Sequence, residues 1–238
     1  MSETTRRIGL LIPSSNTTIE QEFARFGPDG FSFHFARLPM TEVTQAGFDS
    51  QDAAIDAACR LLADARPDAV VLCQSAASFI GGQGYDVTLR ARMEAAAGVP
   101  ALPAGAVMAD ALRALGAAKV ALAVPFAGTA SAAVARYLGV EGLTVVETAS
   151  LGMTDNFSIA AVADEVIVDL AARAAVPQAD VVMMPGGNMR CLPLVSRIEA
   201  AIGRPVVTTN QAVIWKLSRM FAVTLPPDRF GTLAAHTE

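Results

Sequence analysis

The chain has 238 residues, which is enough for one large α/β domain or two smaller ones whose core needs no disulfide bonds. Its three cysteines and two histidines stand at unrelated spacings, which argues against a disulfide framework and against a zinc site. The net charge of −5 comes without a cluster of Lys and Arg, so the sequence also argues against a nucleic-acid partner.

The first apolar stretch of the chain is short. It runs from Ile8 to Ile12 and ends at Pro13, which is too short for a signal peptide or a membrane span. We therefore expect a cytoplasmic protein with no membrane partner. Only 17% of the residues are charged, and Ala, Val and Leu are abundant, so we also expect a subunit interface and a homo-oligomer.

Short β-branched runs alternate with longer alanine-rich stretches of helical period along the whole chain. In chain order we predict strand Ile8–Ile12, a helix from about Thr17, strand Phe31–Ala36, helix Asp52–Ala65, strand Ala69–Leu72, helix Val87–Ala96, strand Lys119–Val124, helix Ala130–Leu138, strand Thr144–Glu147, helix Ile159–Ala174, strand Val181–Met184 and helix Gln211–Phe221. This alternation predicts an α/β fold with parallel sheets covered by helices on both faces. Ligands of such sheets bind beyond the carboxyl ends of the strands.

The sequence contains an internal repeat with an offset of 112 residues. "IGLLIPSSNT" and "VALAVPFAGT" share a strand, a proline and a turn, which pairs Pro13 with Pro125. The same offset places "DAVVLCQSAASF", from Asp68, on "DVVMMPGGNMRC", from Asp180. The alternative is that any two strand-helix units look alike in a chain so rich in Ala and Val.

From the repeat we predict two pseudo-symmetric parallel-sheet α/β halves, residues 1–110 and 111–238, with the active cleft between them. Four loops at strand ends would then converge on the cleft. They are Pro13–Thr18, Gln74–Phe79, Pro125–Thr129 and Gly186–Arg190.

The first of these loops carries small polar residues, Ser14, Ser15 and Asn16, before a helix. The pattern Thr17-x-x-Glu20 predicts a capping box at the start of that helix. Free N–H groups at a helix N-terminus suit a carboxylate or a phosphate. The alternative is that these residues only cap the helix.

Two further loops offer backbone N–H groups with little side-chain bulk. Ser75 and Ala76 do so in the first half, and Gly186 and Gly187 do so in the second. Arg190 would add a bidentate anchor for an anion. Because no metal-ligand cluster and no nucleotide-binding glycine motif accompanies these loops, the sequence predicts a small anionic ligand.

At this point several segments resemble a known family. "RIGLLIPSSNTTIEQEF", "SAASFIGGQGYD", "MTDNFSI" and "GNMRCLPLVSRIEAAIGRPVVTTNQAVIW" are similar to motifs of the aspartate/glutamate racemase superfamily. Within it they resemble the maleate cis-trans isomerase and arylmalonate decarboxylase group, including its ectoine-utilisation branch. The resemblance spans nearly the whole chain. It implies a cleft between two similar halves, no cofactor, and a cysteine at one or both of two symmetric loop positions.

The resemblance also implies roles for individual residues. Asn16 and Asn156 match the substrate-binding asparagines of the group, and Ser75 and Ala76 fall on its amide-donor loop. Apart from the resemblance, we predict that Gly187, Asn188 and Arg190 of the glycine loop, and Phe126, also contact the substrate.

Three positions depart from the group. The first cysteine position falls on Gln74, and the second falls on Gly186, or on Pro185 if the glycine pair is matched to the decarboxylases. Gln74 and Gly186 are also partners at the offset of 112 residues. The tyrosine that the group has at the start of the third loop is Phe126 here. We therefore assign the catalytic positions to Gln74 and Gly186. Candidates for a general acid or base are sparse, and we name Asp155 as one.

The three cysteines of the chain lie away from those positions. We expect strand alternation to turn the Cys73 side chain to the other face, and Cys191 to begin a helix five residues beyond the expected site. Cys59 lies inside a predicted helix. Free cysteines are among the most buried residue types, so core roles are expected, and a shifted loop that brings Cys73 or Cys191 into the cleft is the alternative.

These observations favour a cofactor-independent enzyme that acts on a small carboxylate or dicarboxylate. Backbone amides would stabilise a carboxylate or an enediolate, without the two-cysteine mechanism. Two alternatives stay open. One is a decarboxylase, hydratase or hydrolase in which Gln74 orients a water molecule, and the other is a non-catalytic protein that binds a small anion.

Overall fold

The computed structural model describes residues 5–126 and 128–236 and contains two four-stranded parallel sheets, called here the first and the second sheet. The strands of the first sheet are β1 (Arg6–Pro13), β2 (Phe31–Leu38), β3 (Ala69–Leu72) and β4 (Ala101–Pro103). Those of the second are β5 (Lys119–Phe126), β6 (Thr144–Met153), β7 (Val181–Met184) and β8 (Val206–Thr208). Ala127 of the third predicted loop lies outside the described residues, as do 1–4 and 237–238 at the ends of the predicted halves.

The two sheets have the same strand order. The first sheet is ordered β2-β1-β3-β4 and the second β6-β5-β7-β8, so each strand of the first sheet has a counterpart in the second. All neighbouring strands are parallel. The predicted α/β fold with two similar parallel-sheet halves is confirmed, while the limits at residues 110 and 111 stay a prediction.

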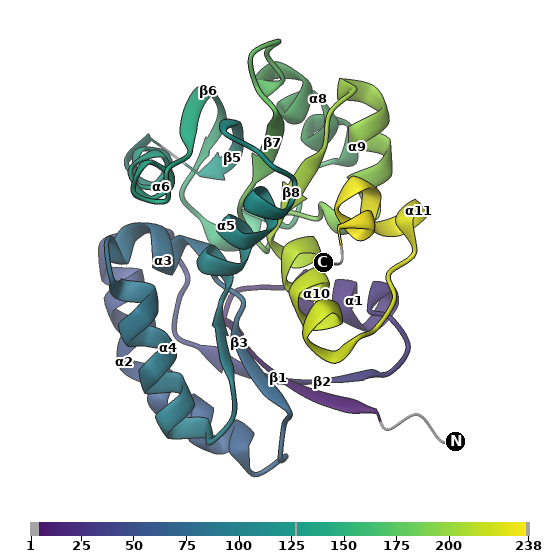
Figure 1. Ribbon diagram of the computed structural model, residues 1–238. Helices are drawn as coiled ribbons and strands as arrows, with labels where there is room; N and C mark the ends of the chain where they lie inside the picture. Colours follow the sequence, from purple (N-terminus) through teal and green to yellow (C-terminus); the bar gives the residue numbers. More distant parts are fainter. Residues whose placement is uncertain (1–4, 127, 237–238) are drawn as a thin grey trace.

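Helices cover both faces of each sheet. The α-helices are α1 (Ile19–Phe26), α2 (Gln45–Ala63), α3 (Ser75–Gly81), α4 (Tyr85–Ala97), α5 (Ala104–Ala114), α6 (Gly128–Val140), α7 (Asn156–Ile159), α8 (Asp164–Ala174), α9 (Val195–Ile202), α10 (Thr209–Phe221) and α11 (Pro227–Phe230). Two 3-10 helices, η1 (Leu192–Leu194) and η2 (Gly231–Ala235), complete the fold. In Figure 1 the first sheet lies below with α2 and α4 beside it, and the second sheet lies above with α8 and α9.

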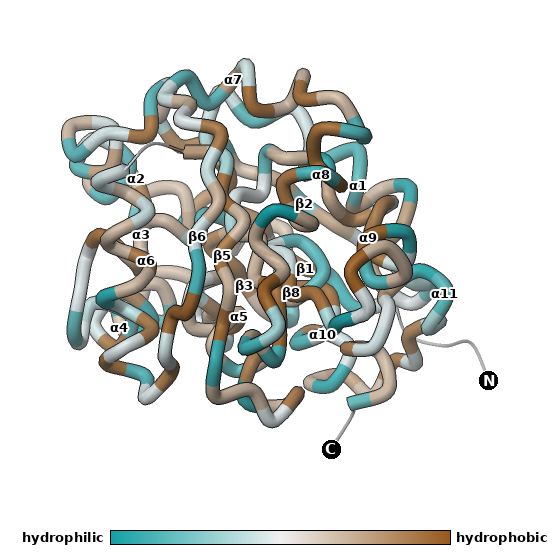
Figure 2. The backbone as a smooth tube through the Cα atoms, turned by 90° about the horizontal axis from the view of Figure 1, so that it is seen from above, coloured by the Kyte–Doolittle hydropathy of each residue, from teal (hydrophilic) through white to brown (hydrophobic). Residues whose placement is uncertain are grey.

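The apolar core has three parts because successive residues of a strand point to opposite faces. On β1, Leu11 packs outward in a core that includes Ile55 of α2 and Leu89 of α4. Its neighbour Leu10 points inward, into a central core that also holds side chains of the second sheet. The outer face of the second sheet packs against α8 through residues such as Ile167. Figure 2, seen from above, places β1, β3, β5 and β8 in the interior.

The two halves meet through helices. α5 packs against both α10 and α3, and α3 packs against α6 of the other half. α10 follows the last strand of the second sheet, yet its Phe221 ring lies 6.1 Å from the Phe31 ring of the first sheet. Figure 1 shows α10 and α1 side by side next to β1 and β2. The carboxyl ends of the central strands of both sheets therefore face a common region.

Two predicted helices differ from the structure. The predicted helix Ile159–Ala174 is wrong, because the Asp155 carboxylate caps the short helix α7, which ends at Ile159, and a new helix starts at Asp164. The acidic residues in the first turn of α8 favour that second start through the helix dipole. α2 begins at Gln45, well before the predicted start, because Thr44 caps it by accepting from the Gly47 N–H.

Among the helices in residues 5–126 and 128–236, none combines the length and the apolar character needed to cross a lipid bilayer.

Candidate active site

A small pocket lies at the carboxyl ends of the central strands, between the two halves. We call it the candidate pocket; its volume is about 30 Å³. It is lined by Pro13, Asn16, Val43, Cys73, Gln74, Ser75, Ala76, Phe126, Asn156, Ile159, Gly186, Gly187 and Asn188. Each of the four loops predicted to converge contributes at least one of these residues, so the structure brings together Gln74 and Gly186, the partners in the repeat.

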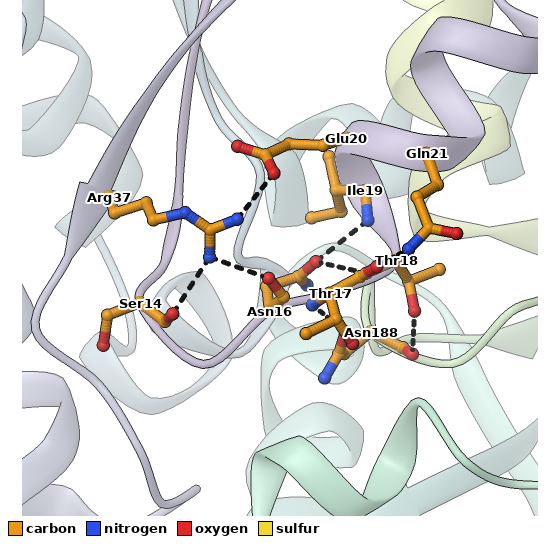
Figure 3. Close-up of polar contacts among 9 residues, drawn as sticks. All are labelled: Ser14, Asn16, Thr17, Thr18, Ile19, Glu20, Gln21, Arg37 and Asn188. Atoms are coloured by element: carbon orange, nitrogen blue, oxygen red, sulfur yellow. Dashed lines mark hydrogen bonds and ion pairs between the residues drawn. The ribbon is translucent and has the colours of Figure 1, made fainter.

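Asn16 shapes the pocket end of α1. Its Oδ1 accepts hydrogen bonds from the N–H groups of Thr18 and Ile19 at 3.0 and 2.9 Å (Figure 3). The predicted capping box is therefore wrong, because Asn16 takes the donors at the start of the helix and the Glu20 carboxylate pairs with Arg37 at 2.6 Å instead. In the described part of the chain, the Asn16 Nδ2 group donates to no protein acceptor, and Asn16 lines the pocket. It is thus a donor available to a ligand.

Arg37 of β2 fixes the loop before Asn16. Its Nη1 donates to the carbonyl oxygens of Ser14 and Asn16 at 2.9 and 2.8 Å (Figure 3). The guanidinium is held in turn by Glu20. The turn that presents Asn16 is therefore tied to the edge strand of the first sheet.

Asn188 joins the two halves at the pocket. Its Oδ1 accepts from the Thr17 N–H at 2.9 Å, and its carbonyl accepts from the Thr18 hydroxyl at 2.8 Å. Its Nδ2 donates to the Asn156 carbonyl at 2.6 Å. Asn156 Nδ2 then donates to the Ser15 hydroxyl at 2.8 Å. These bonds fix both predicted substrate-binding asparagines relative to one another.

α3 presents two N–H donors to the pocket. Gln74 is its N-cap, and Gln74 Oε1 accepts from the Ala77 N–H at 2.6 Å. Ser75 and Ala76 are the first two residues of the helix, so their N–H groups have no acceptor within it. The Gln74 Nε2 group lies 3.5 Å from the Met40 sulfur, which directs it away from the helix end.

The glycine loop after β7 presents the opposite wall. The Gly186 N–H donates to the Thr209 hydroxyl at 3.1 Å, and Thr209 lies 3.2 Å from the Ser75 hydroxyl. Gly186 has a φ of +122°, and a Cβ there would lie 3.0 Å from the Pro125 ring, so the turn requires glycine. Within residues 5–126 and 128–236, the N–H groups of Gly187 and Asn188 donate to no other protein group.

Four predicted site residues do not line the pocket. Ser14 is exposed and Ser15 lies behind Asn156, each bonded to the Met40 carbonyl. Asp155 is exposed and caps α7, and its hydrogen bonds with Ser158 hold the pKa of its carboxyl below the usual range. Arg190 is half exposed and pairs with Asp164. The structure thus places neither the acid-base candidate nor the predicted anion anchor at the pocket.

The cysteines also differ in part from expectation. Cys73 lines the pocket and its side chain packs in the central core, so the expectation that alternation turns it away from the cleft side is wrong. Burial raises the pKa of the Cys73 thiol far above its ordinary value. Cys191 packs in the outer core of the second sheet, where burial and then the charge of Glu22 raise its pKa. Burial raises the pKa of Cys59 to about 11.

Sequence reasoning missed two apolar lining residues, Val43 and Ile159. Val43 precedes α2 and Ile159 ends α7, and no local motif marks either of them. They are brought to the pocket by an antiparallel bridge between Glu42 and Asp155, which only the tertiary structure reveals. In the described parts of the chain, no three His, Cys, Asp or Glu side chains gather as a metal ion would need.

Comparisons with known proteins agree over nearly the whole chain. Residues 8–234 match the sequence model of the family described as arylmalonate decarboxylase. A maleate isomerase from Nocardia farcinica is 31% identical over 225 residues, covering 90% of this chain and 89% of that protein. An arylmalonate decarboxylase from Bordetella bronchiseptica is 29% identical over 218 residues, covering 91% of this chain and 90% of that protein.

Solved structures share the fold. The crystal structure of a maleate isomerase from Pseudomonas putida with maleate has a TM-score of 0.88 at 28% identity, covering 97% of this chain and 98% of that one. A mutant of the Nocardia farcinica maleate cis-trans isomerase with a covalently bound succinylcysteine intermediate has a TM-score of 0.86 at 28% identity. The match covers 93% of this chain and 94% of that one.

Proposed function

The chain belongs to the arylmalonate decarboxylase family, and on this premise we propose that it is a cofactor-independent enzyme, of the isomerase or decarboxylase type, that acts on a small carboxylate or dicarboxylate. Relatives named maleate isomerase and arylmalonate decarboxylase support the substrate class. The similar structure of a maleate isomerase with maleate supports it further.

The observation that carries the proposal is the set of unpaired donors around the candidate pocket. Ser75 and Ala76 offer N–H groups from one wall, and Gly187 and Asn188 offer them from the other. Asn16 Nδ2 adds a side-chain donor. Donors fixed in this way stabilise an oxyanion without reorganising during the reaction, which is a large part of the catalysis of such steps.

For a malonate-type substrate, one carboxylate would be bound by one wall and the other would leave as CO₂. The bond between the central carbon and the leaving carboxylate breaks, and its electron pair moves into an enediolate of the remaining carboxylate. That enediolate is the species that the N–H groups would stabilise. The central carbon then takes a proton from water, and the resulting hydroxide combines with CO₂ as bicarbonate.

We further propose that this chemistry does not use the family's thiol route. The similar Nocardia farcinica protein carries a succinylcysteine intermediate, whereas Gln74 and Gly186 cannot form a thiolate. Cys73, although it lines the pocket, keeps its proton because burial raises its pKa, and a protonated thiol is a poor nucleophile. The competing route would use Cys73 as nucleophile or proton donor.

The alternative in which Gln74 orients a hydrolytic water has less support. Gln74 Oε1 is engaged in capping α3 and Nε2 is directed to Met40. A Gln74→Ala change that abolished turnover while leaving ligand affinity intact would favour that alternative.

A substrate panel tests the proposed activity. The protein would be incubated with maleate, with aryl- and alkylmalonates, and with amino and amide acids, in deuterated water, and the products would be followed by NMR. We expect conversion of at least one compound. If the reaction is a decarboxylation, deuterium should be incorporated at the carbon that loses its carboxylate. Binding of these compounds without turnover, measured by calorimetry, would identify a non-catalytic anion-binding protein.

Cysteine substitution tests the mechanism. Cys73→Ser and Cys191→Ser should each leave kcat/KM within a few-fold of the parent, whereas loss of an essential nucleophile costs several orders of magnitude. Cys191→Ser is the matched control, since Cys191 lies in the outer core and away from the pocket. Rapid inactivation by iodoacetamide that substrate prevents would instead establish a thiol mechanism.

A further inference from the structure

Glu22 is a buried carboxyl group that the proposed reaction does not use. It lies on α1 with 2% of its surface exposed. Its Oε1 accepts from the Leu192 N–H at 3.1 Å, and its Oε2 accepts from Asn210 Nδ2 at 2.6 Å. Glu22 thus joins α1 of the first half to the segment before η1 and to the start of α10.

Asn210 connects Glu22 to the candidate pocket. The same Nδ2 group donates to the Gly187 carbonyl at 3.0 Å. A Cβ at Gly187 would lie 3.0 Å from Asn210 Oδ1, so glycine at this position leaves room for the amide. Thr209, the preceding residue, accepts from the Gly186 N–H. Both pocket glycines are therefore anchored on the first two residues of α10.

Burial and the neighbouring donors and positive charge have opposite effects on the pKa of Glu22. Burial raises the pKa of Glu22 to about 8, while Asn210, the Leu192 N–H and the charge of Arg190 act in the opposite direction. Glu22 also borders a second cavity of about 440 Å³, which the charged residues Arg25, Asp164 and Arg190 line as well. Cys191, beside Leu192, is a further titratable neighbour, and burial and then the charge of Glu22 raise the pKa of its thiol.

We propose that Glu22 is a positioning residue of the candidate pocket: through Asn210 it holds the Gly187 main chain, and loss of its proton tightens that hold. An ionised carboxylate accepts a shorter and stronger hydrogen bond than a neutral acid does. Asn210 Nδ2 then stays directed at both Glu22 and the Gly187 carbonyl. The link to a ligand rests on the proposed function, but the coupling between Glu22 and Gly187 does not.

The coupling is tested by NMR in the protein without ligand. The Glu22 side-chain carbon and the Gly187 and Leu192 amides would be followed from pH 6 to pH 10. We expect all three signals to titrate with one midpoint. In Asn210→Ala the Gly187 amide should no longer follow that midpoint, while the Leu192 amide, which bonds to Glu22 directly, should still follow it. A Gly187 amide that ignores Glu22 in the parent would overturn the proposal.

Two variants complete the test. Glu22→Gln should remove the shared titration of Gly187 and Leu192, whereas Glu165→Gln should keep it, because Glu165 is a surface residue that pairs with Arg197. If the Gly187 amide still titrated in Glu22→Gln, another group would be responsible for its titration, and the proposal would be wrong. Should Glu22→Gln fail to fold, the parent and Asn210→Ala still decide the outcome.

The consequence for binding is measured separately, with maleate and phenylmalonate as probes at pH 8. Glu22→Gln and Asn210→Ala should each weaken affinity by about tenfold. The double variant should be no weaker than the weaker single variant, because both act through one contact. If the losses of affinity in the two single variants added up in the double variant, Glu22 and Asn210 would not act through one contact. If the parent binds neither probe, the proposed function fails while the NMR result still decides on the coupling.

Discussion

The two ends of the Asn16 side chain have different partners. Oδ1 accepts from two N–H groups at the start of α1, while Nδ2 is left for the pocket. The residue therefore combines the capping role that the sequence offered as an alternative with the donor role that the family resemblance implies. Substitutions that remove one end at a time can separate these roles.

For Asn16 we predict different results for Asn16→Ala and Asn16→Asp. Asn16→Ala removes both ends and should lower the free energy of unfolding by about 1 kcal/mol, the usual value of a helix cap, and also weaken ligand binding. Asn16→Asp keeps the acceptor and hence the cap, but it places a negative charge at the pocket. It should keep the stability and weaken the binding of phenylmalonate, as measured by urea denaturation and calorimetry. Unchanged affinity in Asn16→Asp would reduce Asn16 to a helix cap.

At the scale of elements, the position of α3 depends on how closely α5 approaches it. A Cβ at Gly105 of α5 would lie 2.2 Å from the Ser78 Cβ of α3. Since α3 carries the Ser75 and Ala76 donors, this contact sets one wall of the pocket. α5 can approach α3 this closely because Gly105 has no side chain.

Gly105→Ala should therefore destabilise the protein by about 1–3 kcal/mol, as overpacking of a core does, and should also lower affinity for carboxylates by moving α3. Gly139→Ala is the matched control: Gly139 lies in α6 with open space around it, so the change should be neutral or stabilising by up to about 1 kcal/mol. Both values would be read from urea denaturation. Equal stability of the two variants would show that the contact between α3 and α5 is looser than described.

For the whole molecule, burial of Glu22 makes stability depend on pH. The pKa of Glu22 is about 8 in the folded protein, against about 4.3 for a glutamate in an unfolded chain. Between these values the folded state keeps a proton that the unfolded state has released. Stability is therefore lost as the pH rises from about 4.3 to about 8, and it is unaffected by this group above that range.

On the acid side, Asp68 and Asp180 act in the opposite sense. They are partners in the repeat, and each accepts a backbone N–H at the start of a central strand. Although burial acts against it, the Arg7 N–H and the charge of Arg6 hold the pKa of Asp68 below its usual range. Hydrogen bonds from the Lys119 and Ala118 N–H groups do the same for Asp180. Depressed values contribute stability above about pH 3.9 that is lost as the pH falls through them.

We therefore predict a maximum of stability on the acid side of neutrality, measured as the free energy of unfolding in urea from pH 3 to pH 9. Glu22→Gln should flatten the decline between about pH 4.3 and 8, because the variant has no proton to release. Glu165→Gln, at an exposed position, should keep the decline. A parent whose stability rises from pH 5 to pH 8 would contradict the assignment.

Local pattern was enough to predict the architecture. Alternating strand and helix periods, and an offset of 112 residues that pairs Pro13 with Pro125, predict two similar α/β halves before any contact is known. The repeat and the family resemblance also predict that Gln74 and Gly186 meet at one site. The two residues follow strands of different sheets, so the prediction depends on the repeat: the same offset pairs Gln74 with Gly186, and two halves that face each other bring their strand-end loops to one cleft.

Which polar groups are free and which are engaged was decided only by the tertiary structure. Asn16 rather than Thr17 caps α1, Arg190 pairs with Asp164 outside the pocket, and Asp155 caps α7. The roles of these side chains depend on partners distant in sequence, and hydrogen-bonding capacity says nothing about which partner is near. Glu22 is the clearest case: in "TTIEQEF" it looks like one more solvated acid, and only the packing of α1 against α10 makes it a buried one.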